Sequence, residues 1–379
     1  MMDGRASKIV ILPAQLDDLP DEVILKLFVF LSLKELLLCG QVSKRLRRIA
    51  NDESLWIKLN LYEKKVPYDF IEKAAGNGCQ YLGLANCDIL RFTGKSESSF
   101  NLKYLNLKMF YEPCQGTLKL VQNCSSLQKL SISGLKLDSD DIQYICQNSQ
   151  TLQVLDLECC PIDLGNKPEI FQNFFTNCAH LTELNICAQI EDEISKHEIL
   201  LDPHIQALVD NLTPTILKVA LGDQDNLKDE HVKNLVKRCN NITHLELSST
   251  PITNGSVQSI MKYLDKSLEK LNVFWTNVDF TSLHQLKSMT ALKTLICGPM
   301  YVDADIENLS QQLPHIRINE DEDFAIGPSL HIARPFKLIR SGQGLLSNDF
   351  NEEWNYDGDG IWEIRAKQQN LFAKVETDY

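Results

Sequence analysis

Short stretches of the form LxxLxL recur along most of the chain, and their apolar residues alternate with polar ones. Alternation with a period of two predicts a strand that buries one face. The middle apolar positions are Leu59, Leu82, Leu105, Leu130, Leu155, Leu184, Val219, Leu245, Leu271, Leu295 and Ile316. Most intervals between them lie between about 20 and 29 residues, so a regular stacked repeat is expected.

A pair of apolar residues at helical spacing precedes most of these stretches. The pairs are Ile142/Ile145, Ile205/Leu208, Val232/Leu235, Val257/Ile260, Leu283/Leu286 and Ile306/Leu309. A spacing of three places both members on one face of a helix. The unit is therefore strand, loop and helix, which is typical of leucine-rich repeats. We expect residues 57–318 to form about ten such repeats in a mixed α/β horseshoe with strands inside and helices outside.

Residues 18–56 follow helical spacing instead. Pro20 suits the first turn of a helix, where its missing N–H has no cost. Ser43 is placed to cap a third helix. Apolar residues predict one buried face of the first helix at Val23, Ile24, Leu27, Phe28 and Leu31. Three helices this short bury too little surface to be stable alone, so fusion to a larger core or a partner is expected.

The stretch "ANDESLWIKLNL" (50–61) joins the helices to the first repeat. Trp56 is the last residue of the helical pattern. The first LxxLxL stretch also begins with it and continues with Leu59 and Leu61. No Gly/Ser/Pro-rich linker separates the two patterns, so flexible tethering is not expected. We predict that Trp56 is a buried seam between the two modules.

Three further segments fall outside these patterns. Residues 1–17 read as a short leader. Residues 191–202 are an acidic insertion, either a solvated loop or a partner contact. Residues 319–379 break the repeat but are rich in aromatic residues, Phe324 among them, so plain disorder is not expected. We expect this tail to pack back onto the repeats, along the concave face or over one end.

Composition narrows the function. The net charge of −13 argues against nucleic acid as the main partner, which needs a basic face. No apolar run has the length of a membrane helix, so no membrane partner is expected. The twelve cysteines show no zinc-ligand spacing and are expected to be reduced thiols, which leaves no metal site and no cofactor. No catalytic motif is present, so the chain is predicted not to be an enzyme.

Strand side chains that alternate with the buried anchors face the inside of the horseshoe. Asp156, Glu158 and Glu183 on adjacent strands predict an acidic patch. It could receive a basic substrate segment or an internal residue such as Arg334, or it could be a solvated strand face. Adjacent aromatic residues can anchor an interface. The candidate substrate- or accessory-binding residues are Asp156, Glu158, Glu183, Glu246, Phe274, Trp275 and Phe324.

The stretch that begins "LPDEVILKLF" at Leu19 resembles an F-box over its whole spacing. The matching residues are Leu19–Pro20, Glu22, Phe28, Leu31, Leu36, Val42, Lys44–Arg45 and Leu55–Trp56. "LPHIRIN" (313–319), "IARP" (332–335) and "IWEIRAK" (361–367) resemble the closing segments of the S-phase kinase-associated protein 2 family. The basic stretch "SKRLRR" (43–48) is either the polar face of the third helix or a nuclear-import signal.

The resemblance implies a non-catalytic substrate receptor of a Skp–cullin–F-box ubiquitin ligase in the nucleus and cytoplasm. In that family the F-box binds the small Skp adaptor, and the cullin and RING subunits are reached indirectly. The repeats and tail bind protein substrates, including phosphorylated cell-cycle regulators, with help from a small cyclin-dependent-kinase-subunit accessory protein. The residues expected to contact the adaptor are Leu19, Pro20, Leu27, Phe28, Leu31 and Leu36. The alternative is that some of them fill the F-box core and do not touch the adaptor.

The rival interpretation is a leucine-rich-repeat scaffold whose F-box is only a packing cap. The substrate, and any need for phosphorylation or an accessory protein, stay open at this point.

Overall fold

The computed structural model describes residues 19–31, 33–61, 64–85, 87–90, 99–108, 117–148, 150–188, 200–298 and 303–319. The leader expected at 1–17, Phe324 and the rest of the expected tail from 320 onward lie outside these residues. Among the described residues, no helix has both the length and the apolar content to cross a bilayer.

The F-box consists of α1 (Asp21–Phe28), α2 (Leu33–Val42) and α3 (Lys44–Ala50). Helix α1 begins directly after Pro20, and the Ser43 hydroxyl caps α3 by accepting the Leu46 amide N–H at 3.1 Å. Both helix starts are as the sequence predicted. The core residues that the three helices bury are Ile24, Phe28, Leu33, Leu36, Leu46, Ile49 and Ala50.

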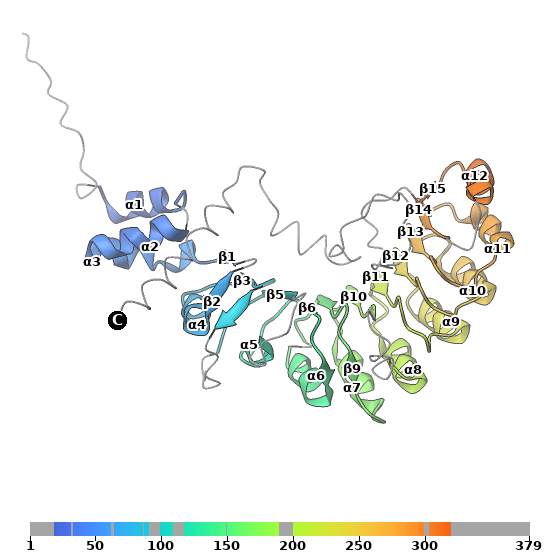
Figure 1. Ribbon diagram of the computed structural model, residues 1–379, viewed down its shortest axis with the longest axis horizontal. Coiled ribbons are helices and arrows are strands. Elements are labelled where there is room, and N and C mark those ends of the chain that lie inside the picture. The colour runs from blue at the N-terminus through green and yellow to red at the C-terminus, as the bar shows by residue number, and fades with distance from the viewer. Residues whose placement is uncertain are drawn as a thin grey trace, which may run out of the picture.

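One parallel sheet of eleven strands lines the inner side of the horseshoe within the described residues (Figure 1). Its strands, in spatial order, are β1 (Lys58–Asn60), β3 (Tyr81–Gly83), β5 (Tyr104–Lys108), β6 (Lys129–Ser133), β8 (Val154–Asp156), β10 (Glu183–Asn185), β11 (Lys218–Ala220), β12 (His244–Glu246), β13 (Lys270–Asn272), β14 (Thr294–Ile296) and β15 (Arg317–Ile318). The F-box lies at the β1 end (Figure 1). The predicted mixed α/β horseshoe is confirmed.

Helices cover the outer side of the sheet (Figure 1). They are α4 (Tyr68–Gly76), α5 (Thr117–Gln122), α6 (Ser139–Cys146), α7 (Glu169–Asn177), α8 (Asp202–Asn211), α9 (Asp229–Arg238), α10 (Asn254–Leu264), α11 (Phe280–Gln285) and α12 (Asp303–Gln312). Short 3-10 turns span Glu53–Leu55 and Leu286–Ser288. Two small parallel pairs join β2 (Lys65–Pro67) to β4 (Asp88–Leu90) and β7 (Leu137–Asp138) to β9 (Ile162–Asp163).

The predicted strand anchors align in one register across the sheet. Leu59 pairs with Leu82, and the alignment continues to Leu295. These anchors and the helix residues behind them form one continuous core. The last anchor is a correction, because Leu295 pairs with Ile318 and not with Ile316. Ile316 instead closes a tight turn after α12 by donating its N–H to the Leu313 carbonyl at 2.9 Å.

Candidate functional site

The F-box residues expected to contact an adaptor divide into two groups. Phe28 and Leu36 are only 4% exposed, so they fill the F-box core, which was the alternative interpretation for them. Leu27 is 46% exposed, Pro20 is also exposed, and Leu19 and Leu31 are half-buried. The predicted single apolar face of α1 is therefore wrong, because Ile24 and Phe28 point inward while Leu27 points outward.

Sequence reasoning did not assign several exposed apolar residues of the F-box to the adaptor contact. Phe30 is 86% exposed, and the others are Val23, Val29, Leu38 and Val42. On α1 and just after it, Val23, Leu27 and Phe30 are spaced by four and three positions, which places them on one side of the helical turn. On α2, Leu38 and Val42 have the same relation. This second stripe was visible in the sequence and is the kind of apolar surface that marks a protein-binding site.

The basic residues of α3 stabilise the F-box itself. Arg45 donates to the Asp21 carboxylate at 2.8 Å, and Arg48 also pairs with Asp21. The hydrogen bond from Arg45 holds the pKa of Asp21 below its ordinary value. Arg47 donates to the Gly40 carbonyl at 2.8 Å. These contacts tie α3 to α1 and α2, as the polar-face interpretation of 43–48 predicts.

Trp56 contacts both modules. Its indole Nε1–H donates to the Ala50 carbonyl at the end of α3 over 2.9 Å. Its ring centroid lies 6.4 Å from that of Phe70 on α4, the first helix of the repeats. The side chain is buried, and β1 begins two residues later. A buried indole with partners on both sides leaves little freedom for the F-box to move relative to the sheet.

The expected acidic patch on the concave face does not form as an open surface. Asp156 and Glu246 are fully buried, which corrects their assignment as exposed binding residues. Asp156 is paired in register with Asn185 on the neighbouring strand, and Glu246 is paired with Asn272 in the same way. Each of the four residues directly follows the buried anchor of its strand. In all four residues a side-chain oxygen accepts the N–H two positions later, at 2.7–3.3 Å. Short polar side chains do this readily, and it satisfies backbone donors where each strand ends.

The two remaining acidic residues of the expected patch are also held in place. Glu183 forms an ion pair with Lys218 on the next strand at 3.2 Å. Glu158 is buried at the end of β8, and its N–H donates to Asp156. The structure brings these carboxylates to neighbouring strands, as expected, and the Glu183–Lys218 ion pair joins β10 to β11.

Buried ionisable groups lie close together where β10, β11 and β12 end. Burial, with a smaller contribution from the nearby Asp223 carboxyl, raises the pKa of Glu246 to about 8. Burial likewise raises the pKa of Asp223 to about 7. Glu246 Oε1 accepts the Ser248 N–H, whereas Oε2 has no hydrogen bond within the described structure. Gly222 lies against this cluster, because a Cβ there would come within 3.2 Å of Cys187 Sγ and Glu246 Oε1.

Phe274 and Trp275 form the most exposed aromatic pair of the concave rim among the described residues. Their rings stack with centroids 6.3 Å apart and an interplanar angle of 12°. Trp275 is 39% exposed and has a φ of 57°, a backbone conformation that is strained for a bulky residue. Its N–H donates to the Gly298 carbonyl at 2.7 Å, which holds that conformation. The same positive φ recurs three residues past the ends of β8, β11 and β12, so this conformation belongs to the repeat. The exposure and the stacking of the two rings are what keep this pair as a candidate anchor.

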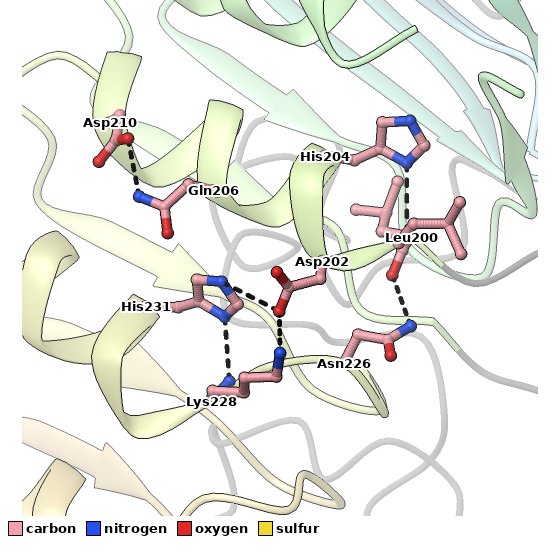
Figure 2. Close-up of polar contacts among 9 residues, drawn as sticks. Leu200, Asp202, His204, Gln206, Asp210, Asn226, Lys228 and His231 are labelled. Atoms are coloured by element: carbon pink, nitrogen blue, oxygen red, sulfur yellow. Dashed lines mark hydrogen bonds and ion pairs between the residues drawn. The ribbon is translucent and has the colours of Figure 1, made fainter. Parts of the chain in front are cut away.

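The end of the acidic insertion is tied to the outer helices (Figure 2). Residues 191–199 lie outside the described structure, but Leu200 and Asp202 do not. The Leu200 carbonyl accepts from Asn226 at 3.0 Å, and Asp202 pairs with Lys228 and lies 3.6 Å from His231 Nε2. These contacts fix Leu200 and Asp202, and so the start of α8, against the residues around α9.

Two buried histidines complete this network (Figure 2). His204 Nδ1 accepts the Leu201 N–H at 3.2 Å, and His231 Nδ1 accepts the Lys228 N–H at 3.1 Å. Each occupies the third helical position, where glutamate or glutamine usually makes this contact. An Nδ1 that accepts a backbone N–H must be unprotonated. Burial accordingly lowers the pKa of both histidines.

Acid is expected to destabilise α8 and α9 through these histidines. Because their folded-state pKa is lowered, their contribution to stability is present above the ordinary value of about 6.5 and is lost as the pH falls below it. Urea unfolding between neutral pH and pH 5 measures this. His204→Gln with His231→Gln keeps an acceptor but cannot titrate, so its stability should change less over that interval. An equal acid loss in the variant would contradict the assignment.

The described residues contain no group of three or more His, Cys, Asp or Glu side chains arranged to hold a metal ion. The cysteines among them are free thiols. Burial raises the pKa of Cys79, Cys124 and Cys239 to about 12, so these thiols stay protonated and pack as apolar groups.

Comparison with known proteins gives two domain matches. A family model described as the SKP2 LRR domain matches residues 70–347, and one described as F-box-like matches residues 16–62. The first match extends beyond 318, the expected end of the repeats. The chain is 45% identical to F-box protein dre-1 of Caenorhabditis elegans over 51 residues, which are 13% of this chain and only 5% of that protein.

Two solved structures are also similar to part of this chain. The actin-binding site 2 of leiomodin-1 shares 20% identity and a TM-score of 0.28, over 40% of this chain and 90% of that chain. The leucine-rich repeat-containing protein LegL7 of Legionella pneumophila shares 13% identity with this chain and has a TM-score of 0.36. The match covers 65% of this chain and 76% of that chain.

Proposed function

The chain belongs to the F-box proteins that carry an SKP2-type leucine-rich-repeat domain, and on that premise we propose that it is a substrate receptor of a Skp–cullin–F-box ubiquitin ligase. The F-box binds the Skp adaptor, which links the chain to the cullin and RING subunits. The repeats hold the target protein. Ubiquitin transfer is then a matter of proximity and orientation, because other subunits supply the chemistry.

The exposed apolar surface of the F-box carries this proposal. Val23, Leu27 and Phe30 lie on one side of α1 and the turn that follows it, and α2 exposes Leu38 and Val42. A small domain gains nothing from leaving so many large apolar side chains in water unless a partner covers them. The buried Trp56 then holds the covered surface in a fixed position relative to the repeats.

We further propose that the targets are cell-cycle regulators, in the nucleus and cytoplasm, whose recognition uses the concave rim. The exposed, stacked Phe274 and Trp275 support a protein contact there. Phosphorylation of the target and a small cyclin-dependent-kinase-subunit accessory protein are parts of this proposal that rest on the family resemblance.

Charge placed on the exposed stripe is expected to abolish adaptor binding. Leu27→Asp with Phe30→Asp puts two carboxylates into an apolar contact, so affinity for the purified Skp adaptor should fall about 100-fold or more. Neither side chain belongs to the F-box core, so the thermal midpoint should change little. Titration calorimetry measures the affinity. Asn51→Asp, at an exposed polar position at the end of α3 and outside the apolar stripe, is the control and should bind normally.

The same pair of variants separates a ligase receptor from a scaffold. One observation favours the scaffold, in which the F-box only caps the end of the repeats. Trp56 joins the F-box directly to β1. In cells, Leu27→Asp with Phe30→Asp should lengthen the half-lives of bound targets, and Asn51→Asp should not. Wild-type protein that fails to bind the adaptor, or unchanged target half-lives, would refute the receptor assignment.

A further inference from the structure

Four side chains on the first four strands of the sheet form a continuous row. Lys58, Tyr81, Tyr104 and Lys129 are direct neighbours in the strand register. Lys58 Nζ lies 4.7 Å from the Tyr81 ring centroid, and Lys129 Nζ lies 4.9 Å from that of Tyr104. The two tyrosine rings meet edge to face with centroids 4.4 Å apart. Each ammonium group is thus positioned by a ring, and the row has a cation at each end.

The described positions beside this row on the same four strands carry no opposing charge. On these four strands, the residues before and after the row include one lysine, Lys103, and no carboxylate. The complete set is Ile57, Gln80, Lys103 and Gln128 before the row, and Asn60, Gly83, Asn106 and Ser131 after it. The first concave carboxylate among the described strands is on β8, where Asp156 is fully buried.

This local cationic surface contrasts with the whole chain, whose net charge is −13. None of the four side chains of the row is fully buried, and Lys58 is exposed. A concave surface of one sign concentrates its field and attracts the opposite charge. The tyrosines between the cations add flat apolar area with a polar tip, which suits a peptide backbone and its side chains.

We propose that this row, which we call the Lys–Tyr cradle, binds an extended acidic segment of a partner protein through two carboxylates four residues apart. Lys58 and Lys129 are separated by three strand intervals, which span about 14 Å. Four residues of extended chain span about 13 Å, so the two carboxylates reach the two ammonium groups. The residues between them lie over Tyr81 and Tyr104 and are best apolar.

The cradle lies at the F-box end of the sheet, since β1 follows Trp56 by two residues. If the receptor function proposed above holds, an acidic target segment is bound close to the adaptor. Peptide binding itself needs no adaptor. A failure of one proposal therefore leaves the other standing.

Fluorescence anisotropy with the full chain and no adaptor tests the cradle. The probe is a labelled peptide Gly-Ser-Glu-Val-Pro-Val-Glu-Gly-Ser, in which proline favours the extended form. Lys58→Glu with Lys129→Glu should weaken its binding about tenfold or more. Lys58→Gln with Lys129→Gln, a milder change, should weaken it in the same direction. Lys237→Glu with Lys287→Glu makes the same charge change at exposed positions on the outer side and should have no comparable effect.

Control probes test the spacing and the class of partner. A peptide with the two glutamates adjacent, or with glutamine in their place, should bind at least about fivefold more weakly. Equal binding of these peptides, equal loss in the outer-side variant, or no binding of the probe overturns the proposal. A single-stranded oligonucleotide that binds in preference to the peptide overturns it as well, in favour of nucleic acid.

Discussion

Trp56→Ala is expected to lower the free energy of unfolding by about 4 kcal/mol, the usual cost of removing a buried tryptophan from a packed core. The substitution empties the space between α3 and α4 and leaves the Ala50 carbonyl without its indole donor. Urea unfolding followed by circular dichroism measures the change. Trp56→Phe keeps an aromatic ring but loses the Nε1–H and part of the ring volume, so it should cost about half as much, roughly 2 kcal/mol.

The functional consequence of Trp56→Ala differs from its stability effect. A loosened seam lets the F-box turn relative to the sheet, so ubiquitination of a bound target should fall more than target binding does. Assays of both, at a temperature where the variant remains folded, give the comparison. Equal losses would indicate general misfolding, and a stability change as small as that of Trp56→Phe would contradict the seam.

Glu246→Gln is expected to stabilise the repeats increasingly as the pH rises, by about 1 kcal/mol at pH 5 and by up to about 5 kcal/mol at pH 8.5. The pKa of Glu246 is raised to about 8 in the folded chain by burial. Its stabilising contribution is therefore fully present below the unfolded-state value of about 4.3 and is lost as the pH rises through 8. Glutamine cannot ionise, and its side-chain oxygen can still accept the Ser248 N–H.

Urea unfolding at several pH values between 5 and 8.5 gives the stability difference between variant and wild type. Glu230→Gln removes an exposed carboxylate on the outer side of α9 and is the matched control. A difference for Glu246→Gln that does not grow with pH would show that the buried carboxyl ionises at little cost in the folded chain.

The repeat architecture is the part of the structure that local patterns predicted best. The strand anchors from Leu59 to Leu295 align as expected, because each repeat buries the same positions against its neighbours. The prediction was wrong at Ile316. In the string "LPHIRI" (313–318) both Ile316 and Ile318 are apolar residues that could be the strand anchor. Only the position of α12 and the pairing of Ile318 with Leu295 distinguish them.

The F-box shows a different limit. The sequence predicted that its short helices are amphipathic and that Trp56 joins them to the repeats. It did not separate Phe28, which is buried, from Leu27, which is exposed, because α1 carries apolar residues on more than one side. Packing against α3 decides which side is the core, and that depends on contacts distant in the chain.

On the concave face, the order of residues along each strand determined which side chains alternate with the anchors. The tertiary structure decided what these side chains do. Asp156 and Glu246 turn back to backbone donors at the strand ends, whereas Lys58, Tyr81, Tyr104 and Lys129 line up as one surface. Residues on different strands become neighbours only through the register of the sheet. A local pattern therefore specifies each repeat, but a surface shared by several repeats exists only after they stack.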